Sequence, residues 1–212
     1  MPCTICKVRR PRRYCPGVSG EICAQCCGTE REVTVSCPLD CEYLRESRRH
    51  EKPNGRDPAE FPNRDIKVSE KLLTDKERLL TFLSLTIYRS AMETPGVADR
   101  DVLDALDGLV RTYRSLQSGL LYESRPGNSL AGAIYSAVQE AVDSYREREQ
   151  QELGMANTRD ADVLALLVFL QHFALFQENG RPRGRAFLDA LRAYHVPAPA
   201  ESGSAASSII LR

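Results

Sequence analysis

All eight cysteines of this 212-residue chain lie within its first 41 residues, and this crowding constrains the fold more than any other feature of the sequence. They are Cys3, Cys6, Cys15, Cys23, Cys26, Cys27, Cys37 and Cys41. The chain starts without the apolar run of a secretory signal, so we expect it to stay in the reducing cytoplasm, where disulfides are rare. Because eight buried thiols would make a poor core, the cysteines are expected to bind metal.

Two pairs of cysteines have the C-x2-C spacing that lets two thiolates of one turn reach the same zinc ion. Cys3 and Cys6 form the first pair, Cys23 and Cys26 form the second, and the 16 residues between them are a normal span for a zinc ribbon or treble clef. These four predict one zinc site. The other four predict a second site, made by Cys15, Cys27, Cys37 and Cys41. Adjacent Cys26 and Cys27 point in different directions, which favours different ions for them and leaves the full pairing open.

The motifs Cys3-x2-Cys6, Tyr14-Cys15-Pro16 and Ile22-Cys23-Ala24-Gln25-Cys26-Cys27 resemble those of HIT-type and related cross-brace, treble-clef zinc fingers. The resemblance covers residues 1–50. It implies two zinc ions held by eight ligands, in a module that serves mainly as a platform for protein interaction. The chain departs from that pattern in lacking a C-terminal His-Cys ligand pair and in having vicinal cysteines, so the family's ligand pairing is not carried over.

The chemistry available to these cysteines is structural or redox. A site made only of cysteines has no open position for a substrate, which favours structural over catalytic zinc. The chain contains no phosphate-binding glycine loop, nucleophile elbow or H-E-x-x-H motif, and we therefore lean against an enzyme. A thiol redox sensor remains an alternative, because C-x2-C pairs also cycle between dithiol and disulfide.

The composition changes along the chain and predicts four segments. Residues 1–50 form the zinc module, and the polar, proline-containing residues 51–65 read as a linker. Residues 66–196 have apolar positions at helical spacing and predict an all-α bundle of about five helices, so the chain as a whole is expected to be mainly α. Residues 197–212 are too poor in apolar side chains to fold alone and predict a flexible tail.

The five helices are predicted from their apolar periodicity and end signals. Thr74 and Glu77 fit a capping box that starts the first helix, which runs to about Met92. The second has one apolar stripe, made by Val102, Leu106, Leu109, Tyr113, Leu116 and Leu120, beside which Asp101, Asp104 and Asp107 are expected to face solvent. The third starts near Leu130 and ends in a solvated charged run, 146–152. The fifth carries Phe187, Leu188, Leu191 and Tyr194.

The fourth helix, Asp160 to Gln177, is apolar nearly all round and is expected at the centre of the bundle. Its most apolar stretch spans 14 residues, fewer than the roughly 20 that a bilayer requires, so we do not expect a membrane partner. A helix this apolar could bury part of itself against a second copy, which leaves a homo-oligomer open.

Two basic segments give the chain an alternative role in binding nucleic acid. Lys7, Arg9, Arg10, Arg12 and Arg13 place five cations within seven residues, where a loop could meet phosphates. The same cations are explained equally simply if they balance the negative charge of zinc ions bound to four thiolates. Arg183 and Arg185 belong to a partial AT-hook motif, which we expect instead to be an ordered loop between two helices.

The sequence therefore predicts a non-enzymatic zinc-binding protein with an adaptor or regulatory role, whose partner is another protein. A nucleic-acid-binding regulator that uses the loop 7–13 is the alternative, and a thiol redox sensor is the second.

Overall fold

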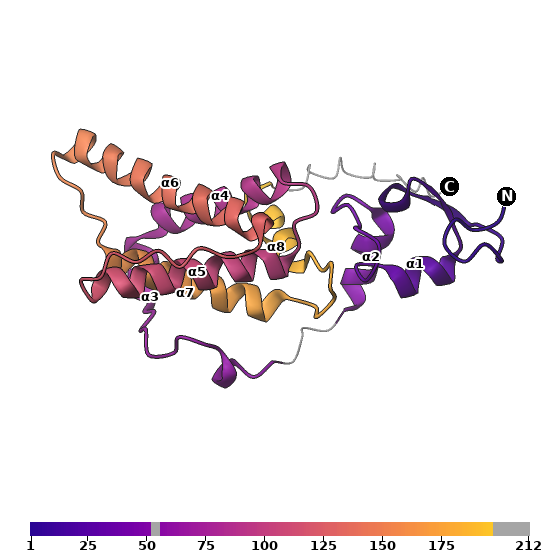
Figure 1. The fold of residues 1–212 in the computed structure, drawn as a ribbon, viewed down its shortest axis with the longest axis horizontal. Coiled ribbons are helices and arrows are strands. Elements are labelled where there is room, and N and C mark those ends of the chain that lie inside the picture. Colours follow the sequence, from indigo (N-terminus) through magenta and orange to yellow (C-terminus); the bar gives the residue numbers. More distant parts are fainter. Residues whose placement is uncertain (52–55, 197–212) are drawn as a thin grey trace, which may run out of the picture.

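The computed structural model describes residues 1–51 and 56–196, which form a small cysteine-rich module beside an elongated helical bundle (Figure 1). The cysteine module comprises residues 1–50, and the helical bundle comprises residues 66–196. The described residues contain eight α-helices and one two-stranded sheet. The prediction of a mainly helical chain is confirmed, and the predicted tail, 197–212, lies outside the described residues.

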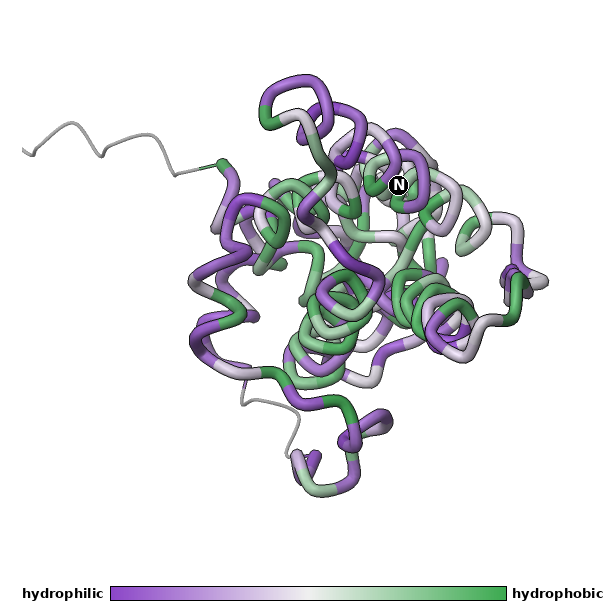
Figure 2. The backbone as a smooth tube through the Cα atoms, turned by 90° about the vertical axis from the view of Figure 1, so that its left-hand side faces the viewer, coloured by the Kyte–Doolittle hydropathy of each residue, from purple (hydrophilic) through white to green (hydrophobic). Residues whose placement is uncertain are grey.

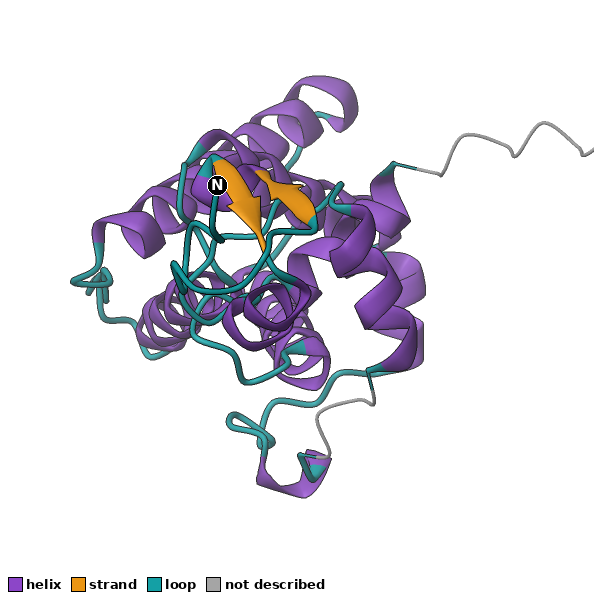
Figure 3. Ribbon diagram, turned by 90° about the vertical axis from the view of Figure 1, so that its right-hand side faces the viewer, coloured by secondary structure: helices purple, strands orange, loops and turns teal. Residues whose placement is uncertain are grey.

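The cysteine module is built from a β-hairpin and two helices (Figure 3). Strands β1 (Arg13–Cys15) and β2 (Gly20–Ile22) pair antiparallel, with Arg13 opposite Ile22 and Cys15 opposite Gly20. Helices α1 (Ala24–Glu30) and α2 (Glu42–His50) follow. Their buried cluster contains five cysteines and only three other residues, Ile22, Val35 and Leu44, so sulfur atoms supply most of the interior.

The bundle contains four long helices, one of six residues before them and one of ten residues after them. Their bounds are α3 Glu70–Asp75, α4 Glu77–Glu93, α5 Asp99–Gln117, α6 Ser129–Leu153, α7 Asp160–Gln177 and α8 Ala186–His195. Helix α5 packs against α6 and α7, while α4 packs against α6 and α8. Figure 2 shows the hydrophobic residues gathered where the helices face one another.

The fourth predicted helix is confirmed with its bounds as α7, and it forms part of the centre of the bundle. Val163 to Val168 are all buried, and the helix packs against both α5 and α8. By length and composition α7 is also the one helix of the described residues that could cross a membrane. In the fold, 56% of that helix is buried against its neighbours.

The first bundle helix does not start at the predicted capping box. Ser69 caps α3 by accepting a hydrogen bond from Leu72 N at 3.2 Å, and Thr74 lies inside that helix. The Thr74 hydroxyl donates to Glu70 O at 3.1 Å, and the N-cap position of α4 is Lys76, which makes no side-chain cap hydrogen bond. A side-chain hydroxyl can bond backward into its own helix as readily as forward into the next, and here the backward bond forms.

Three other side chains lie differently from their predicted positions. Leu120 follows the end of α5 and is 64% exposed, and Tyr194 on α8 is 65% exposed, so neither belongs to the core. Asp101 is buried, because its carboxylate accepts hydrogen bonds from Ala98 N at 2.8 Å and Asn128 Nδ2 at 2.6 Å. It caps α5 from within, and the prediction that it faces solvent is wrong.

The polar segment that follows residue 55 lies against the bundle. Pro62 O accepts a hydrogen bond from His172 Nε2 at 2.6 Å, and the Phe61 ring lies 5.4 Å from the His172 ring. Asp65 forms an ion pair with Arg114 of α5 at 2.6 Å. These contacts hold the chain along α5 and α7 between the module and α3.

Candidate metal centre

Two tight turns of the chain present the two C-x2-C pairs. Cys3 and Cys6 lie in a turn closed by a hydrogen bond from Lys7 N to Cys3 O at 2.8 Å. Lys7 has a φ of 59°, in the left-handed region, which lets the chain reverse after Cys6. Cys23 is the N-cap of α1 and Cys26 lies in its first turn, so the start of this helix carries both sulfurs of the second pair.

The hairpin joins the two turns. Thr4 N donates to Glu21 O at 2.8 Å, and Arg12 N donates to Ile22 O at the same distance, so the first turn and the residue before β1 are both bonded to β2. The approach is so close that a Cβ on Gly20 would lie 2.6 Å from Thr4 Oγ1. A glycine is therefore required where the N-terminal turn crosses the hairpin.

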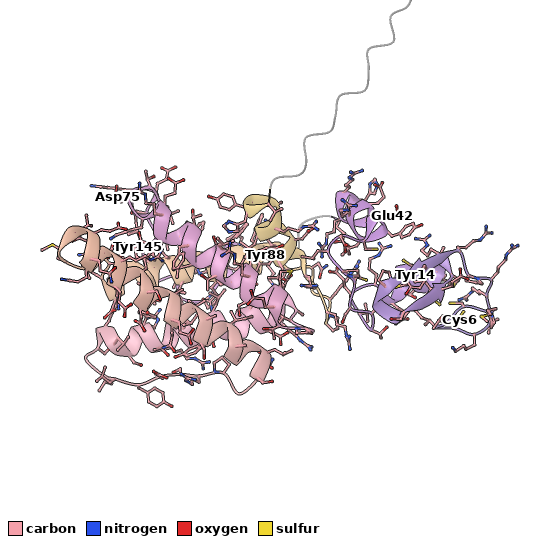
Figure 4. The ribbon with its side chains drawn as sticks, turned by 90° about the horizontal axis from the view of Figure 1, so that it is seen from above. Cys6, Tyr14, Glu42, Asp75, Tyr88 and Tyr145 are labelled. Atoms are coloured by element: carbon pink, nitrogen blue, oxygen red, sulfur yellow. The ribbon has the colours of Figure 1, made fainter. Side chains whose placement is uncertain are left out.

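The sulfur atoms of Cys3, Cys6, Cys23 and Cys26 lie within 4.8 Å of one another. A zinc ion bound to four thiolates at about 2.3 Å places the sulfurs about 3.8 Å apart, which this arrangement can accommodate with small movements. Cys3, Cys23 and Cys26 are buried and Cys6 is half-buried. Figure 4 shows Cys6 at the outer end of the cysteine module, away from the bundle. The donor set thus fits a closed four-thiolate metal site.

Backbone N–H groups stabilise negative charge on the first cysteine pair. Burial raises the pKa of the Cys3 thiol, but hydrogen bonds from the backbone N–H groups of Cys23, Cys6 and Ile5 outweigh it and lower that pKa to about 6. The Cys23 N–H lies 3.2 Å from Cys3 Sγ. The pKa of Cys6 is also lowered, mainly by the N–H of Arg9.

Cys26 behaves in the opposite way. Burial and the sulfurs around it raise the pKa of the Cys26 thiol to about 12. Four thiolates cannot crowd together without a cation to compensate them, so a divalent ion would have to displace this proton. Metal binding at these four residues is therefore expected to release protons and to weaken as the pH falls.

The second predicted set is not gathered to the same degree. Cys15 and Cys37 are buried in the same interior as the first site, and Cys27 and Cys41 pack against it. Among the described residues only the first set has all its sulfurs within 4.8 Å of one another, and the second set does not. Cys27 Sγ instead receives hydrogen bonds from Arg13 Nη1 at 3.7 Å and Arg31 Nη2 at 3.8 Å.

The basic loop divides into exposed and structural residues. Lys7, Arg9, Arg10 and Arg12 are exposed. Arg13 is half-buried, with its guanidinium 3.8 Å from the centre of the Tyr43 ring and in contact with Cys27. The cysteine sulfurs, Cys23 first, raise the pKa of Arg9, which therefore balances the charge of the first site.

Arg183 and Arg185 lie in an ordered loop between α7 and α8, as expected, and that loop contacts the cysteine module. Arg183 Nη1 donates to Ser36 Oγ at 2.6 Å, and Arg185 N donates to Glu32 Oε1 at 3.0 Å. Glu32 is fully buried, which no feature of the sequence indicated. Glu30, two residues earlier, has the same side chain and only local partners, so residue type alone could not separate them.

The histidines hold structural positions. His172 is half-buried and bonded to a backbone carbonyl, as described above. His195 Nε2 lies 2.9 Å from Ser84 Oγ beside an apolar hollow of about 250 Å³. Burial and the charge of Arg89 lower the pKa of His195. The Ser84 hydroxyl donates to Thr81 O at 3.0 Å, so its proton is directed at the helix backbone and not at the histidine.

No family model, curated protein or solved structure matches the chain.

Proposed function

We propose that the cysteine module is a structural zinc module and that the chain is a non-enzymatic adaptor or regulatory protein. The observation that carries the proposal is the gathering of Cys3, Cys6, Cys23 and Cys26 within 4.8 Å, at the start of one helix and in one tight turn. Four sulfur donors, three of them buried, suit zinc and leave no open position for a substrate. The order of turn, hairpin and helix agrees with the resemblance to treble-clef zinc fingers.

The proposal includes a second zinc ion held by Cys15, Cys27, Cys37 and Cys41. Their support is shared burial in one small interior and the two guanidinium groups at Cys27, which suit a sulfur that carries negative charge. Binding would draw the four sulfurs together, while Arg13 and Arg31 would remain beside the charged centre.

The mass of the purified, reduced protein under native and denaturing conditions tests both sites. A difference equal to two zinc ions supports the full proposal, and one ion supports the first site only. Cys26→Ser and Cys37→Ser assign the ions, since each variant should lose the ion of its own set. A wild-type protein that carries no metal would overturn the zinc proposal and favour the thiol redox sensor.

The partner in this proposal is another protein, and the loop after α5 is the surface that supports it. Leu120, Leu121 and Tyr122 are consecutive and are 64%, 94% and 67% exposed. Large exposed apolar side chains that lie together commonly mark sites of protein interaction. A partner that binds here should be retained by the wild-type protein and released by Leu121→Asp, with no change in bound zinc.

Nucleic acid is the second candidate partner. Arg12, the residue before β1, and Tyr14 within it are both exposed and lie two residues apart, so they share one face of the extended chain. A cation beside an aromatic ring is the usual platform for a single-stranded base. Replacing Lys7, Arg10 and Arg12 by alanine should abolish salt-sensitive binding of an oligonucleotide, and unchanged binding would remove this alternative.

A further inference from the structure

Glu32 joins the cysteine module to the helical bundle through a fully buried carboxylate. Its Oε1 lies 2.6 Å from Arg48 Nη2 and accepts a hydrogen bond from Arg185 N at 3.0 Å. Its Oε2 accepts a hydrogen bond from Asn179 Nδ2 at 2.9 Å. The backbone takes part as well, because Arg183 N donates to Glu32 O at 2.8 Å. Three of these four partners belong to the loop between α7 and α8.

The bundle side of this junction leads directly into α8. Arg48, on α2, pairs with Asp189 of α8 as well as with Glu32. Near the end of the same loop, the Gly184 carbonyl accepts a hydrogen bond from Asp99 N at 2.8 Å. The Asp99 carboxylate in turn accepts the N–H of Phe187 at 2.9 Å. The Arg48 ion pairs and the hydrogen bonds of this loop thus connect Glu32 to the first turn of α8.

The module side of the junction depends on the cysteines. Glu32 lies between α1, which contains Cys26 and Cys27 and is capped by Cys23, and Cys37, which follows five residues later. It has a φ of 55°, in a left-handed conformation that a glutamate does not favour and that its surroundings must impose. The residues on its two sides, Arg31 and Val35, form a β-bridge that closes the loop.

A second contact follows immediately along the chain. Leu39, between Cys37 and Cys41, is 6% exposed and packs in the core of the bundle, not in the core of the module. The cysteines on either side of it belong to the module's own interior. The module therefore contacts the bundle through the carboxylate of Glu32 and the apolar side chain of Leu39. Both residues lie in the chain between cysteines whose side chains pack in the module's interior.

We propose that the Glu32 junction couples metal binding by the cysteine module to the order of α8, so that the chain reports metal occupancy through the bundle. Loss of metal would release α1 and the loop behind it and would withdraw Glu32 from the junction. Arg48 would then lose one of its two carboxylate partners and pair with Asp189 alone, and a buried charge that loses a partner destabilises the network. This inference rests on the proposed function, because it requires that the cysteines bind metal.

Coupling of this kind is reciprocal: if metal stabilises the junction, the junction must strengthen metal binding by the same factor. The sharper test therefore changes the junction and measures the metal. Glu32→Gln keeps the shape of the side chain and removes its charge. Asn179→Ala removes the hydrogen bond to Glu32 Oε2 together with the local one from Arg181 N to Asn179 Oδ1. It lies well outside the cysteine module in sequence and is the milder variant should Glu32→Gln fold poorly.

The zinc affinity of the full-length protein is measured by competition with a chromophoric chelator. We expect roughly tenfold weaker binding for Glu32→Gln and a smaller loss for Asn179→Ala, in the usual range of coupling between sites. Glu30→Gln is the matched control. Glu30 lies two residues before Glu32 and carries the same charge, but its side chain bonds only to Thr29 and Thr34 among the described residues. This variant should bind zinc as the wild type does.

Amide hydrogen exchange of the wild-type protein, with zinc and after chelation, supplies the second readout. We expect α8 to lose protection with α1 when zinc is removed, while α6, which packs mainly against α4 and α5, keeps its protection. Wild-type affinity in both junction variants, or an α8 that keeps its protection after chelation, would overturn the coupling and leave the zinc module standing. A wild-type protein that binds no zinc would overturn the proposed function and the coupling together.

Discussion

The cysteine module and the helical bundle are stabilised in different ways. Twenty-eight buried residues form one continuous core in the bundle, whereas the module's own buried cluster has eight residues, five of them cysteines. A segment of about 50 residues rarely buries enough apolar surface to fold without a metal, a disulfide or a partner. The bundle is therefore expected to fold on hydrophobic burial, and the module is expected to fold on its ligand.

Removal of metal should have the largest effect, and it tests this comparison directly. A structural zinc contributes on the order of 10 kcal/mol to the folding of the segment that binds it. With chelator and reductant present, α1 and α2 should lose their amide protection while α5 and α7 keep theirs. Hydrogen exchange followed by mass spectrometry resolves the two regions, and a bundle core that unfolds together with the module would contradict the division.

A cavity in the bundle core should have the next largest effect. Leu166 on α7 is fully buried, so Leu166→Ala is expected to lower the free energy of unfolding by about 2–5 kcal/mol. The number of bound zinc ions should not change, because the cysteines and Leu166 belong to separate interiors. Denaturant titration gives the first quantity and native mass gives the second. Leu121→Ala, at a side chain that is 94% exposed, is the control and should change stability little.

Asp99 should give the bundle a pH dependence that is separate from that of the cysteines. Burial raises the pKa of Asp99 to about 7, against the N–H groups of Phe187 and Leu188, which act to lower it. The folded state therefore holds a proton that the unfolded chain releases near pH 4, so this contribution to stability is complete at low pH and is lost as the pH rises to 7.

The variant Asp99→Asn isolates this contribution. Between pH 5.5 and 7.5 the wild type should lose about 2 kcal/mol of unfolding free energy relative to Asp99→Asn, given roughly 1.4 kcal/mol per pH unit for one proton. Denaturant titrations of both proteins at saturating zinc measure the difference, in which the titration of the cysteines cancels. Parallel pH profiles for the two proteins would show that Asp99 does not titrate in this range.

The sequence predicted the parts of the molecule that follow local rules. The fourth helix appears with its predicted bounds because its apolar residues leave no polar face, and the first cysteine set gathers because C-x2-C spacing fits one turn. Both signals depend on neighbours within a few residues. Local spacing accounts for each cysteine pair, and the β-hairpin between the pairs brings the two together.

Contacts between distant segments could not be predicted in this way. Glu32 is buried by Asn179 and Arg185, about 150 residues further along the chain, and nothing near Glu32 marks it. Asp101 repeats at helical spacing with Asp104, yet it is buried because Asn128 reaches it from the next helix. In each case the local sequence around the polar side chain is ordinary, and the side chain is buried because the tertiary fold brings a distant hydrogen-bond partner to it.

The smallest expected effect comes from the N-cap of the first bundle helix, for which Ser69 and Thr74 are the two candidate residues. Ser69→Ala should lower the free energy of unfolding by about 1 kcal/mol, the usual cost of losing a side-chain N-cap, because Leu72 N loses its acceptor. Thr74→Ala should cost much less, since Thr74 is exposed and its hydroxyl bonds only to Glu70 O of its own helix. Denaturant titration of the pair compares the two positions at the same short helix. Equal losses, or a larger loss at Thr74, would restore the capping box that the sequence pattern indicated and would show that α3 and α4 exchange their boundary in solution.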